Sequence, residues 1–168
     1  AVLAAVSGAA LAQSSVTVYG ILDLGYQWNE VPADVGTTAA PRIEQESYSA
    51  INGSHVYGNR WGLRGSEDLG GGWRAIFTLE SGFNVDTGTA GQGGRLFGRQ
   101  AFVGVDGGLG TLVAGRLATF SSGTGSFDMF GRVDPFMTGF GLAAIANTFI
   151  SANALRFDNA VLYRSPRV

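Results

Sequence analysis

The chain has 168 residues, of which 45% are hydrophobic and 14% charged, and it contains 27 glycines, four prolines and no cysteine. This composition is too apolar for a disordered chain and poorer in charge than most soluble domains, and it excludes disulfides and thiolate metal sites. The net charge of −2 gives nucleic-acid binding no electrostatic support. No unbroken apolar run reaches the roughly 18 residues of a membrane-spanning helix.

The first twelve residues form a small, apolar segment, AVLAAVSGAALA. It ends in Ala10-Leu11-Ala12, which fits the rear part of a secretory signal peptide and its A-x-A cleavage site. We therefore expect residues 1–12 to be the end of a signal peptide and residues 13–168 to be the start of a single mature domain. A soluble N-terminal helix is the alternative.

A long strand is predicted at residues 15–28, SVTVYGILDLGYQW, because apolar side chains occupy most of the even positions. Such a strand exceeds the usual length in globular proteins and suits a tilted strand that crosses a bilayer. Tyr26 and Trp28 end its apolar side, where an interfacial aromatic girdle would lie. Residues 30–59 are predicted to be a long loop, in which His55 has no ligand-spaced partner.

An antiparallel hairpin is predicted at residues 60–83, RWGLRGSEDLGGGWRAIFTLESGF. Large apolar residues such as Trp61 and Trp73 alternate with polar ones in both halves, and the glycine-rich turn at 68–72 is free to adopt positive φ. Each strand thus has an apolar face and a face that carries arginine.

Three further strands are predicted at residues 95–105, 111–117 and 154–163, the first two joined by a short glycine turn at 106–110. The total is about six strands, in which short turns alternate with long loops. Outer-membrane β-barrels show the same asymmetry. The segment 118–153 is long and rich in phenylalanine, so we expect it to pack against the protein and to be functional.

No catalytic, cofactor or metal site is indicated. GLRGSEDLGGG lacks the Lys-Ser/Thr of a phosphate-binding loop and precedes a strand, no carboxylate pair has a spacing typical of acid/base catalysis, and a G-x-S-x-G nucleophile motif is absent. The sequence therefore predicts neither an enzyme nor a nucleotide-binding protein.

The chain resembles the N-terminal half of the trimeric general porins of Gram-negative outer membranes. The resemblance is carried by SSVTVYGILDLG, NRWGLRGSEDLGGGWRAIFTLESGF, GGRLFGRQAFVGVDGGLGTLVAGR and RFDNAVLYRSP, which together span most of the mature segment. It implies an all-β, antiparallel transmembrane barrel of 16 strands, of which this chain supplies about six. It also implies that residues 118–153 are the third loop, folded into the lumen to form a constriction. Six strands alone are not expected to form a working pore.

The resemblance also assigns site residues. Arg60, Arg99 and Arg156 match the basic cluster of the family's constriction, and each alternates with apolar neighbours. Asp134 and Asp128 match the acidic side that the inserted loop supplies, although PFMTGFGL lacks the glutamate of the usual loop motif, which implies a weak negative side. The polar faces of the strands, which would line the lumen of a barrel, add Arg64, Arg74 and Glu80 as expected pore-lining residues. Arg116 alternates with Leu112 and Ala114, so it is expected at a subunit interface.

The function implied is passive diffusion of small hydrophilic solutes and ions through a homotrimeric outer-membrane channel, in contact with membrane lipid and lipopolysaccharide. Because arginines outnumber the loop acids, we expect mild anion selectivity. Three alternatives stay open at this point: a small closed barrel that acts as a structural protein or adhesin, a substrate-specific sugar channel, and a soluble lectin-like sandwich.

Overall fold

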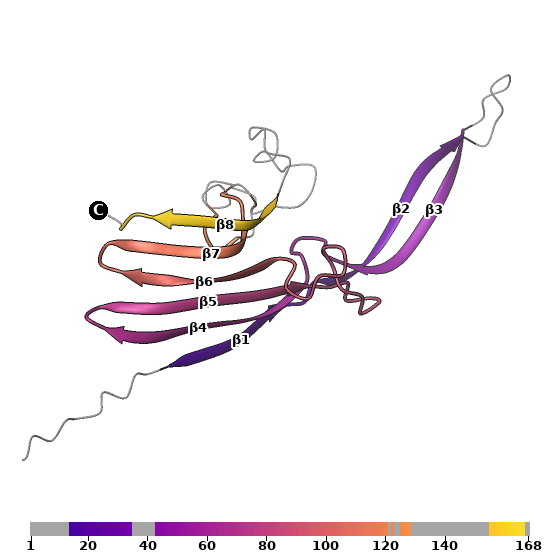
Figure 1. The fold of residues 1–168 in the computed structure, drawn as a ribbon. Coiled ribbons are helices and arrows are strands. Elements are labelled where there is room, and N and C mark those ends of the chain that lie inside the picture. The colour runs from indigo at the N-terminus through magenta and orange to yellow at the C-terminus, as the bar shows by residue number, and fades with distance from the viewer. Residues whose placement is uncertain (1–13, 35–42, 121, 123–124, 129–154, 167–168) are drawn as a thin grey trace, which may run out of the picture.

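The computed structural model describes residues 14–34, 43–120, 122, 125–128 and 155–166. The fold is all-β, with a six-stranded antiparallel sheet in the order β1-β4-β5-β6-β7-β8 and a two-stranded hairpin, β2-β3, that extends beyond one end of the sheet (Figure 1). The strands are β1 (Ser15–Ile21), β2 (Leu24–Asp34), β3 (Ile43–Gly53), β4 (Arg60–Gly70), β5 (Trp73–Gly82), β6 (Gln100–Gly107), β7 (Gly110–Ala118) and β8 (Arg156–Arg164). In the described part of the chain, no helix has the length and hydropathy needed to cross a membrane.

The sheet has two chemically different faces, which we call the apolar face and the polar face. Strand pairing places residues directly opposite one another on the same face. The apolar face includes Val18, Leu63, Leu79, Val103, Ala114 and Val161, and the polar face includes Tyr19, Arg64, Thr78, Glu80, Gln100, Asp106 and Thr111. Val18, Val103 and Val161 are each more than 60% exposed. An exposed apolar face of this extent is typical of a sheet that contacts lipid.

Tight turns lie at one end of the sheet and long connections at the other (Figure 1). Gly71-Gly72 joins β4 to β5 and Gly108-Leu109 joins β6 to β7. Gly70, Gly71 and Gly72 all have positive φ, between 61° and 81°, which a side chain would disfavour. The glycine turns predicted from the sequence are confirmed.

Three predicted boundaries are wrong. The strand expected over 15–28 is interrupted between Ile21 and Leu24, and β2 then continues to Asp34. Much of the loop expected over 30–59 is instead strand, because Ile43–Gly53 pairs along its whole length with β2. The strand expected over 95–105 begins only at Gln100. The sheet therefore has the six strands expected, and the β2-β3 hairpin adds two more.

The base of the β2-β3 hairpin is held by Asp23 and Asn59. The Asp23 carboxylate accepts hydrogen bonds from the backbone N–H groups of Val56 and Tyr57, both at 2.7 Å. Asn59 is 2% exposed, and its side chain donates to Asp23 O at 3.0 Å and to Ser54 Oγ at 3.2 Å. These contacts hold the loop of residues 54–59, which connects β3 to β4, against Asp23. They explain why the strand predicted over 15–28 breaks at Asp23.

Hydrogen bonds from the backbone N–H groups of Tyr57 and Val56 lower the pKa of Asp23 below its ordinary value of 3.8. Because the pKa is lowered in the folded state, the Asp23 carboxylate stabilises the loop of residues 54–59 fully above pH 3.8. This stabilisation is lost as the pH falls through the lowered pKa. We expect Asp23→Ala to accelerate hydrogen exchange at the amides of residues 54–57 near neutral pH. Amides in the centre of β5 are expected to be unchanged.

Asp23→Asn is the matched control, since it keeps the acceptor oxygen without the charge. Its exchange rates should fall between those of the wild type and Asp23→Ala. Equal exchange in all three proteins would contradict this account of the hairpin base.

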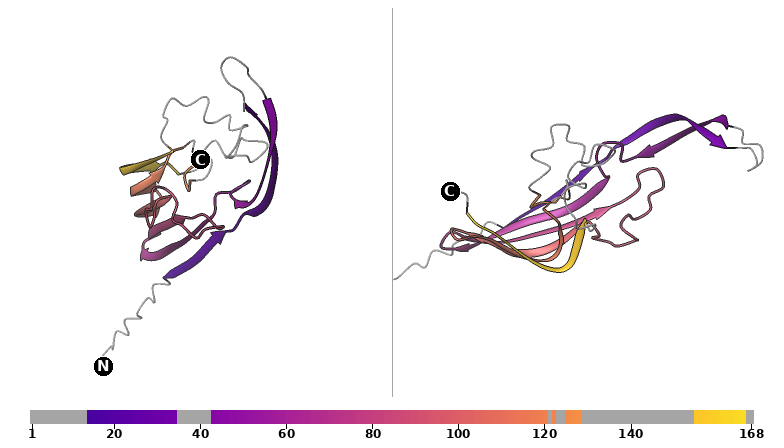
Figure 2. Two further views of the ribbon diagram at one scale, coloured as in Figure 1. Left: turned by 90° about the vertical axis from the view of Figure 1, so that its right-hand side faces the viewer. Right: turned by 90° about the horizontal axis from the view of Figure 1, so that it is seen from above.

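The segment after β7 packs against the polar face of the sheet. Phe127 is 9% exposed and forms a small apolar cluster with Phe102, Val113, Leu117 and Leu162. The rings of Phe127 and Phe102 have their centroids 5.5 Å apart, and the backbone N–H of Ser126 donates to Gln100 Oε1 at 2.9 Å. The sheet curves around this side, as the two views in Figure 2 show. The expectation that a phenylalanine of segment 118–153 packs against the protein is confirmed for Phe127, and residues 129–153 lie outside the described residues.

Candidate constriction site

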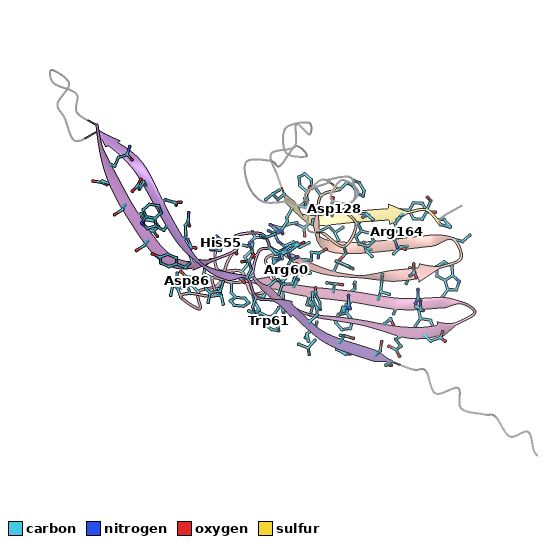
Figure 3. The ribbon with its side chains drawn as sticks, turned by 180° about the vertical axis from the view of Figure 1, so that it is seen from behind. His55, Arg60, Trp61, Asp86, Asp128 and Arg164 are labelled. Carbon is cyan, nitrogen blue, oxygen red and sulfur yellow. The ribbon has the colours of Figure 1, made fainter. Side chains whose placement is uncertain are left out.

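The candidate site lies at the end of the sheet where the long connections are. Arg60 is the first residue of β4, Arg156 is the first residue of β8, and Arg99 immediately precedes β6. Because neighbouring strands are antiparallel, Glu80 near the end of β5 reaches the same level and pairs directly with Gln100. Figure 3 shows Arg60 where the sheet meets the β2-β3 hairpin.

Glu80 is the centre of the site. Its side chain is 5% exposed and accepts a hydrogen bond from Arg99 Nε at 2.7 Å, while the Arg99 side chain is 3% exposed. The second carboxylate oxygen accepts from the Tyr19 hydroxyl at 2.9 Å. Removal of one partner from a buried, charge-assisted pair of this kind strongly destabilises the folded protein, because the remaining charge is buried without compensation.

Arg60 and Arg156 complete the cluster. Arg60 is 8% exposed and its Nε donates to Gly58 O at 3.0 Å, and Arg156 Nε donates to Arg99 O at 2.9 Å. The charges of Arg60 and Arg156 interact with those of Arg99 and Glu80. Three guanidinium groups against one carboxylate leave two positive charges uncompensated among these four residues. The structure thus brings together the three arginines that the resemblance singled out.

Alternation within a strand does not explain where Arg99 lies. By position it would share a face with Ala101 and Val103, which lie on the apolar face. Because β6 begins at Gln100, the pleat does not fix the direction of Arg99, and its guanidinium bonds to Glu80 instead. The sequence-based argument from alternation is therefore wrong for Arg99, although the residue does join the cluster.

The other predicted pore residues occupy different parts of the sheet. Arg64 lies on the polar face, with its guanidinium carbon 5.3 Å from the centre of the Tyr19 ring. Arg74 lies near the tight turns and pairs with Asp106. Arg116 pairs opposite Ala101 on the apolar face, and there its Nε donates to Gly98 O at 2.8 Å and its guanidinium pairs with Asp158. Arg116 thus has binding partners within its own chain.

The acidic side of the site is only partly described. Asp128 lies in the segment that follows β7, and its backbone N–H donates to Gly125 O at 3.2 Å. Asp134 lies outside the described residues. The sequence analysis missed Tyr19, which is far from Glu80 along the chain and is placed beside it only through the pairing of β1 with β4 and of β4 with β5.

No group of three or more His, Cys, Asp or Glu side chains that could hold a metal ion occurs among the described residues. His55 is exposed at the base of the hairpin (Figure 3). The chemistry that the cluster offers is electrostatic: a positively charged, hydrogen-bonding wall on the polar face of a sheet whose other face is apolar.

A curved antiparallel sheet whose apolar face is on the outer side and whose charged, polar face is on the inner side is typical of part of a transmembrane β-barrel. A sequence model described as Gram-negative porin matches residues 1–168. The chain belongs to the Gram-negative porins, a family of non-enzymatic channels of the bacterial outer membrane.

Individual relatives support this assignment. The chain is 44% identical to an outer membrane porin protein of Bordetella pertussis, over 99% of this chain and 43% of the relative. It is 39% identical to outer membrane porin protein 32 of Delftia acidovorans, over 99% of this chain and 44% of the relative. Among solved structures it resembles the anion-selective porin from Comamonas acidovorans, with a TM-score of 0.61, 27% identity and coverage of 93% of this chain and 44% of that one. The chain spans less than half the length of these relatives.

Proposed function

We propose that the protein forms a water-filled channel for passive diffusion of small hydrophilic solutes and ions, with a preference for anions. The observation that carries the proposal is the cluster of Arg60, Arg99 and Arg156 around Glu80, which places two uncompensated positive charges on the polar face. The similar porin from Comamonas acidovorans is described as anion-selective, which supports the same choice.

The expected preference is moderate. A unit charge about 7 Å from a permeating ion contributes roughly 0.6 kcal/mol in bulk water and about 2 kcal/mol at an effective dielectric constant near 20. Two such charges in a wide aqueous pore therefore lower the energy of an anion by about 1 to 5 kcal/mol at low salt, and they raise the energy of a cation by the same amount. Screening reduces this range, because the Debye length falls from about 10 Å at 0.1 M salt to about 3 Å at 1 M.

Segment 118–153 is proposed to be the loop that narrows the channel, with Asp128 and Asp134 on its acidic side. The packing of Phe127 on the polar face supports this proposal, because it directs the start of the segment to the inner side of the sheet. Residues 1–12 are proposed to be the end of a signal peptide.

A homotrimer in contact with lipid and lipopolysaccharide is proposed for the assembled protein, with the exposed apolar face towards lipid or a neighbouring subunit. Arg116 lies on that face and remains a proposed interface residue, although its pairing with Asp158 offers a reason for its presence that requires no second subunit. Chemical cross-linking of the detergent-solubilised full-length protein tests the number of subunits: a single band at the mass of a monomer would contradict the trimer.

A liposome swelling assay tests the channel itself. Liposomes that contain the full-length protein should swell in small sugars and amino acids at rates that fall with solute size, which is typical of diffusion through a pore. Swelling no faster than that of protein-free liposomes would rule out a channel and favour the closed structural barrel.

A further inference from the structure

The β2-β3 hairpin carries an exposed apolar surface, which we call the hairpin patch. It consists of Leu24, Tyr26, Trp28 and Ile51, each more than 50% exposed. Tyr26 pairs opposite Ile51, and Leu24 and Trp28 are each two residues from Tyr26 along β2. The four side chains therefore lie on one face of the hairpin.

The opposite face of the hairpin is polar. It includes Gln27 and Asn52, and Asn52 Nδ2 donates to Gln27 Oε1 at 2.8 Å. Tyr48, which pairs opposite Asn29, lies on this face and is 54% exposed. The hairpin is thus amphipathic, with one exposed tyrosine on each face.

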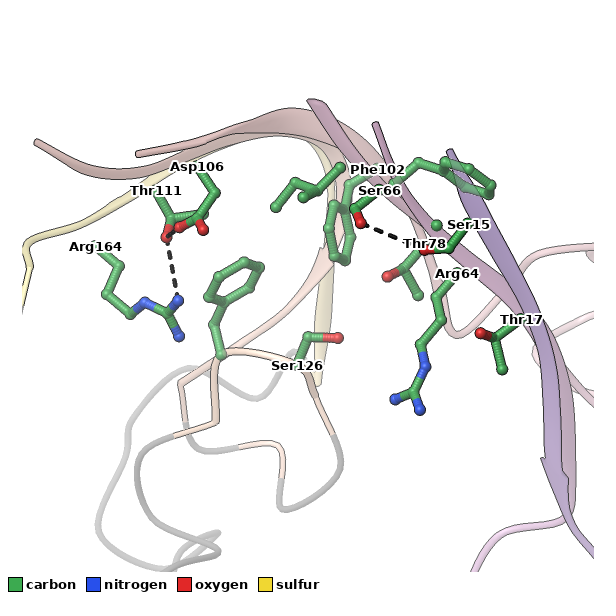
Figure 4. A pocket seen from close by; sticks show the side chains of 14 residues that line it. Ser15, Thr17, Arg64, Ser66, Thr78, Phe102, Asp106, Thr111, Ser126 and Arg164 are labelled. Atoms are coloured by element: carbon green, nitrogen blue, oxygen red, sulfur yellow. Dashed lines mark hydrogen bonds between the residues drawn. The ribbon is translucent and has the colours of Figure 1, made fainter. Parts of the chain in front are cut away.

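The path of solutes does not account for the hairpin patch. The polar face of the sheet lines the lumen of the proposed channel, and it contains a hollow that Arg64 and Arg164 enter from opposite sides (Figure 4). Charged side chains of this kind suit contact with water and ions. The hairpin patch is apolar and extends beyond the end of the sheet (Figure 1).

Hydrocarbon chains do not account for the patch either, because it lies beyond the membrane-spanning part of the sheet. β4 runs ten residue steps from Gly70 at the tight turn to Arg60, which is about 33 Å along the strand. At a strand tilt of about 40° this corresponds to a height of roughly 25 Å, which matches the apolar band of an outer-membrane barrel. Ile21 pairs with Arg60, and Tyr26 is five residues further along the chain, about 17 Å at the rise of a strand.

The charge of the hairpin disfavours anionic lipid head groups. β2 and β3 contain no Lys or Arg but have four acidic residues, Glu30, Asp34, Glu44 and Glu46. Proteins recognise anionic lipids with clusters of Lys and Arg, and carboxylates repel phosphate groups. A protein surface is therefore the better partner for the hairpin patch, since aromatic residues are enriched where proteins meet.

Further strands of the same barrel do not cover the patch. Even-numbered residues carry the apolar side chains in β2, as they do in β1, where Val18 lies on the apolar face. The hairpin patch thus keeps the parity of the apolar face, which is the outer face of a barrel. Strands that continue a barrel wall pair edge to edge and leave its outer side free.

The hairpin needs a partner for its stability. An isolated two-stranded hairpin is marginally stable in water, and it becomes stable when a third strand or another body packs against it. β2 and β3 pair over eleven residues each, and no third strand joins them in the described part of the chain. Packing of a neighbouring protein on the patch supplies this stabilisation.

The chain also carries a surface of matching character at the end of the sheet where the long connections are. Leu96, in the connection between β5 and β6, is 64% exposed. Next to it, Arg95 shares the carboxylate of Asp158 with Arg116, which leaves one positive charge in excess among these three residues. Within one chain this surface does not cover the patch, because Leu96 and Tyr26 are both more than 60% exposed. Two different surfaces that complement each other only between copies form a head-to-tail contact, which closes into a ring.

We propose that the hairpin patch packs against a neighbouring copy of this chain, beyond the hydrocarbon layer, on the surface that contains Arg95 and Leu96. The proposal rests on the proposed homotrimer, and it names the surfaces that join the subunits outside the membrane. It does not depend on conduction.

Photo-cross-linking of the full-length protein in outer membranes identifies what covers the patch. The photoreactive p-benzoylphenylalanine in place of Trp28 is expected to give a product with the mass of two subunits, joined near Leu96. The same probe in place of Tyr48, on the polar face, is the control and should give at least about tenfold less of this product.

Other products would overturn the proposal. Capture of lipopolysaccharide by the Trp28 probe, capture only within its own chain, or equal yields of the two-subunit product from both positions would each do so. A two-subunit product joined far from Leu96 would overturn the receiving surface and keep the neighbouring copy as the occupant.

Variants test the contribution of the patch to assembly. The double variant Tyr26→Ser/Trp28→Ser should dissociate into monomers in detergent at least about tenfold faster than the wild type, whereas Tyr48→Ser should dissociate at the wild-type rate. Circular dichroism should show unchanged strand content in both, because these side chains lie outside the six-stranded sheet. Wild-type dissociation of the double variant would overturn the proposal.

Failure of this interface is distinguishable from failure of the proposed function. A protein that is trimeric by chemical cross-linking, but whose Trp28 probe captures only its own chain, would overturn the interface and leave the trimer and the channel intact. A protein whose Trp28 probe captures a second copy, but which gives no liposome swelling, would overturn the channel and leave the interface intact.

Discussion

Replacement of Arg99 by glutamine is expected to lower both the anion preference and the stability of the protein. The substitution removes the partner of a carboxylate that is 5% exposed, and breaking a buried ion pair from one side costs about 3 to 5 kcal/mol. It also reduces the uncompensated charge of the four-residue cluster from two to one. Urea unfolding in detergent measures the loss of stability, and the reversal potential in planar bilayers measures the loss of anion preference.

The double variant Arg99→Gln/Glu80→Gln separates these effects. It removes both members of the pair, so it should regain most of the lost stability, and it restores two uncompensated charges, so its reversal potential should return to near that of the wild type. Glu80→Gln alone leaves three uncompensated arginines and should be the most anion-selective of the four proteins. A double variant that stays as unselective as Arg99→Gln would contradict the assignment of selectivity to net charge.

Replacement of Phe127 by alanine is expected to loosen the start of segment 118–153. Phe127 is 9% exposed and contacts the apolar cluster on the polar face, and truncation of a buried phenylalanine costs about 3 to 5 kcal/mol. A loss of this size lowers the ratio of docked to undocked segment by more than a hundredfold. Single-channel recordings should therefore show increased current fluctuations and a larger mean conductance.

Phe120→Ala is the matched control for this variant. Phe120 belongs to the same segment but is 46% exposed, so its truncation should leave the recordings unchanged. Recordings of Phe127→Ala that cannot be told from those of Phe120→Ala would show that the apolar contact does not hold the segment in place.

The sequence predicts the sheet well because the features that define it are local. Alternation between apolar and polar residues is visible in any strand with one face towards an apolar medium, and Gly70, Gly71 and Gly72 mark a turn by their freedom of φ alone. The six strands of the sheet, its two faces and its tight turns follow from such patterns.

Features that depend on distant residues are not predicted. β3 reads IEQESYSAING, which is too polar to be recognised as a strand, and it becomes one by pairing with β2. The break at Asp23 depends on hydrogen bonds from residues 56 and 57, and the bond between Glu80 and Tyr19 spans 61 positions.

The candidate site falls between these cases. Family resemblance identified Arg60, Arg99 and Arg156, whereas alternation alone would have placed Arg99 on the wrong face. Their part in a channel constriction, and that of Asp128 and Asp134, stays a prediction that depends on measurements of conduction.

The reversal potential of the full-length wild-type protein in a potassium chloride gradient tests the central claim most directly. The two uncompensated charges of the cluster should make chloride more permeant than potassium, clearly so with a mean salt concentration near 0.1 M and much less so near 1 M, where the charges are screened. A reversal potential of the opposite sign, with potassium the more permeant ion at low salt, would contradict the claim that the arginine cluster sets the selectivity of this channel.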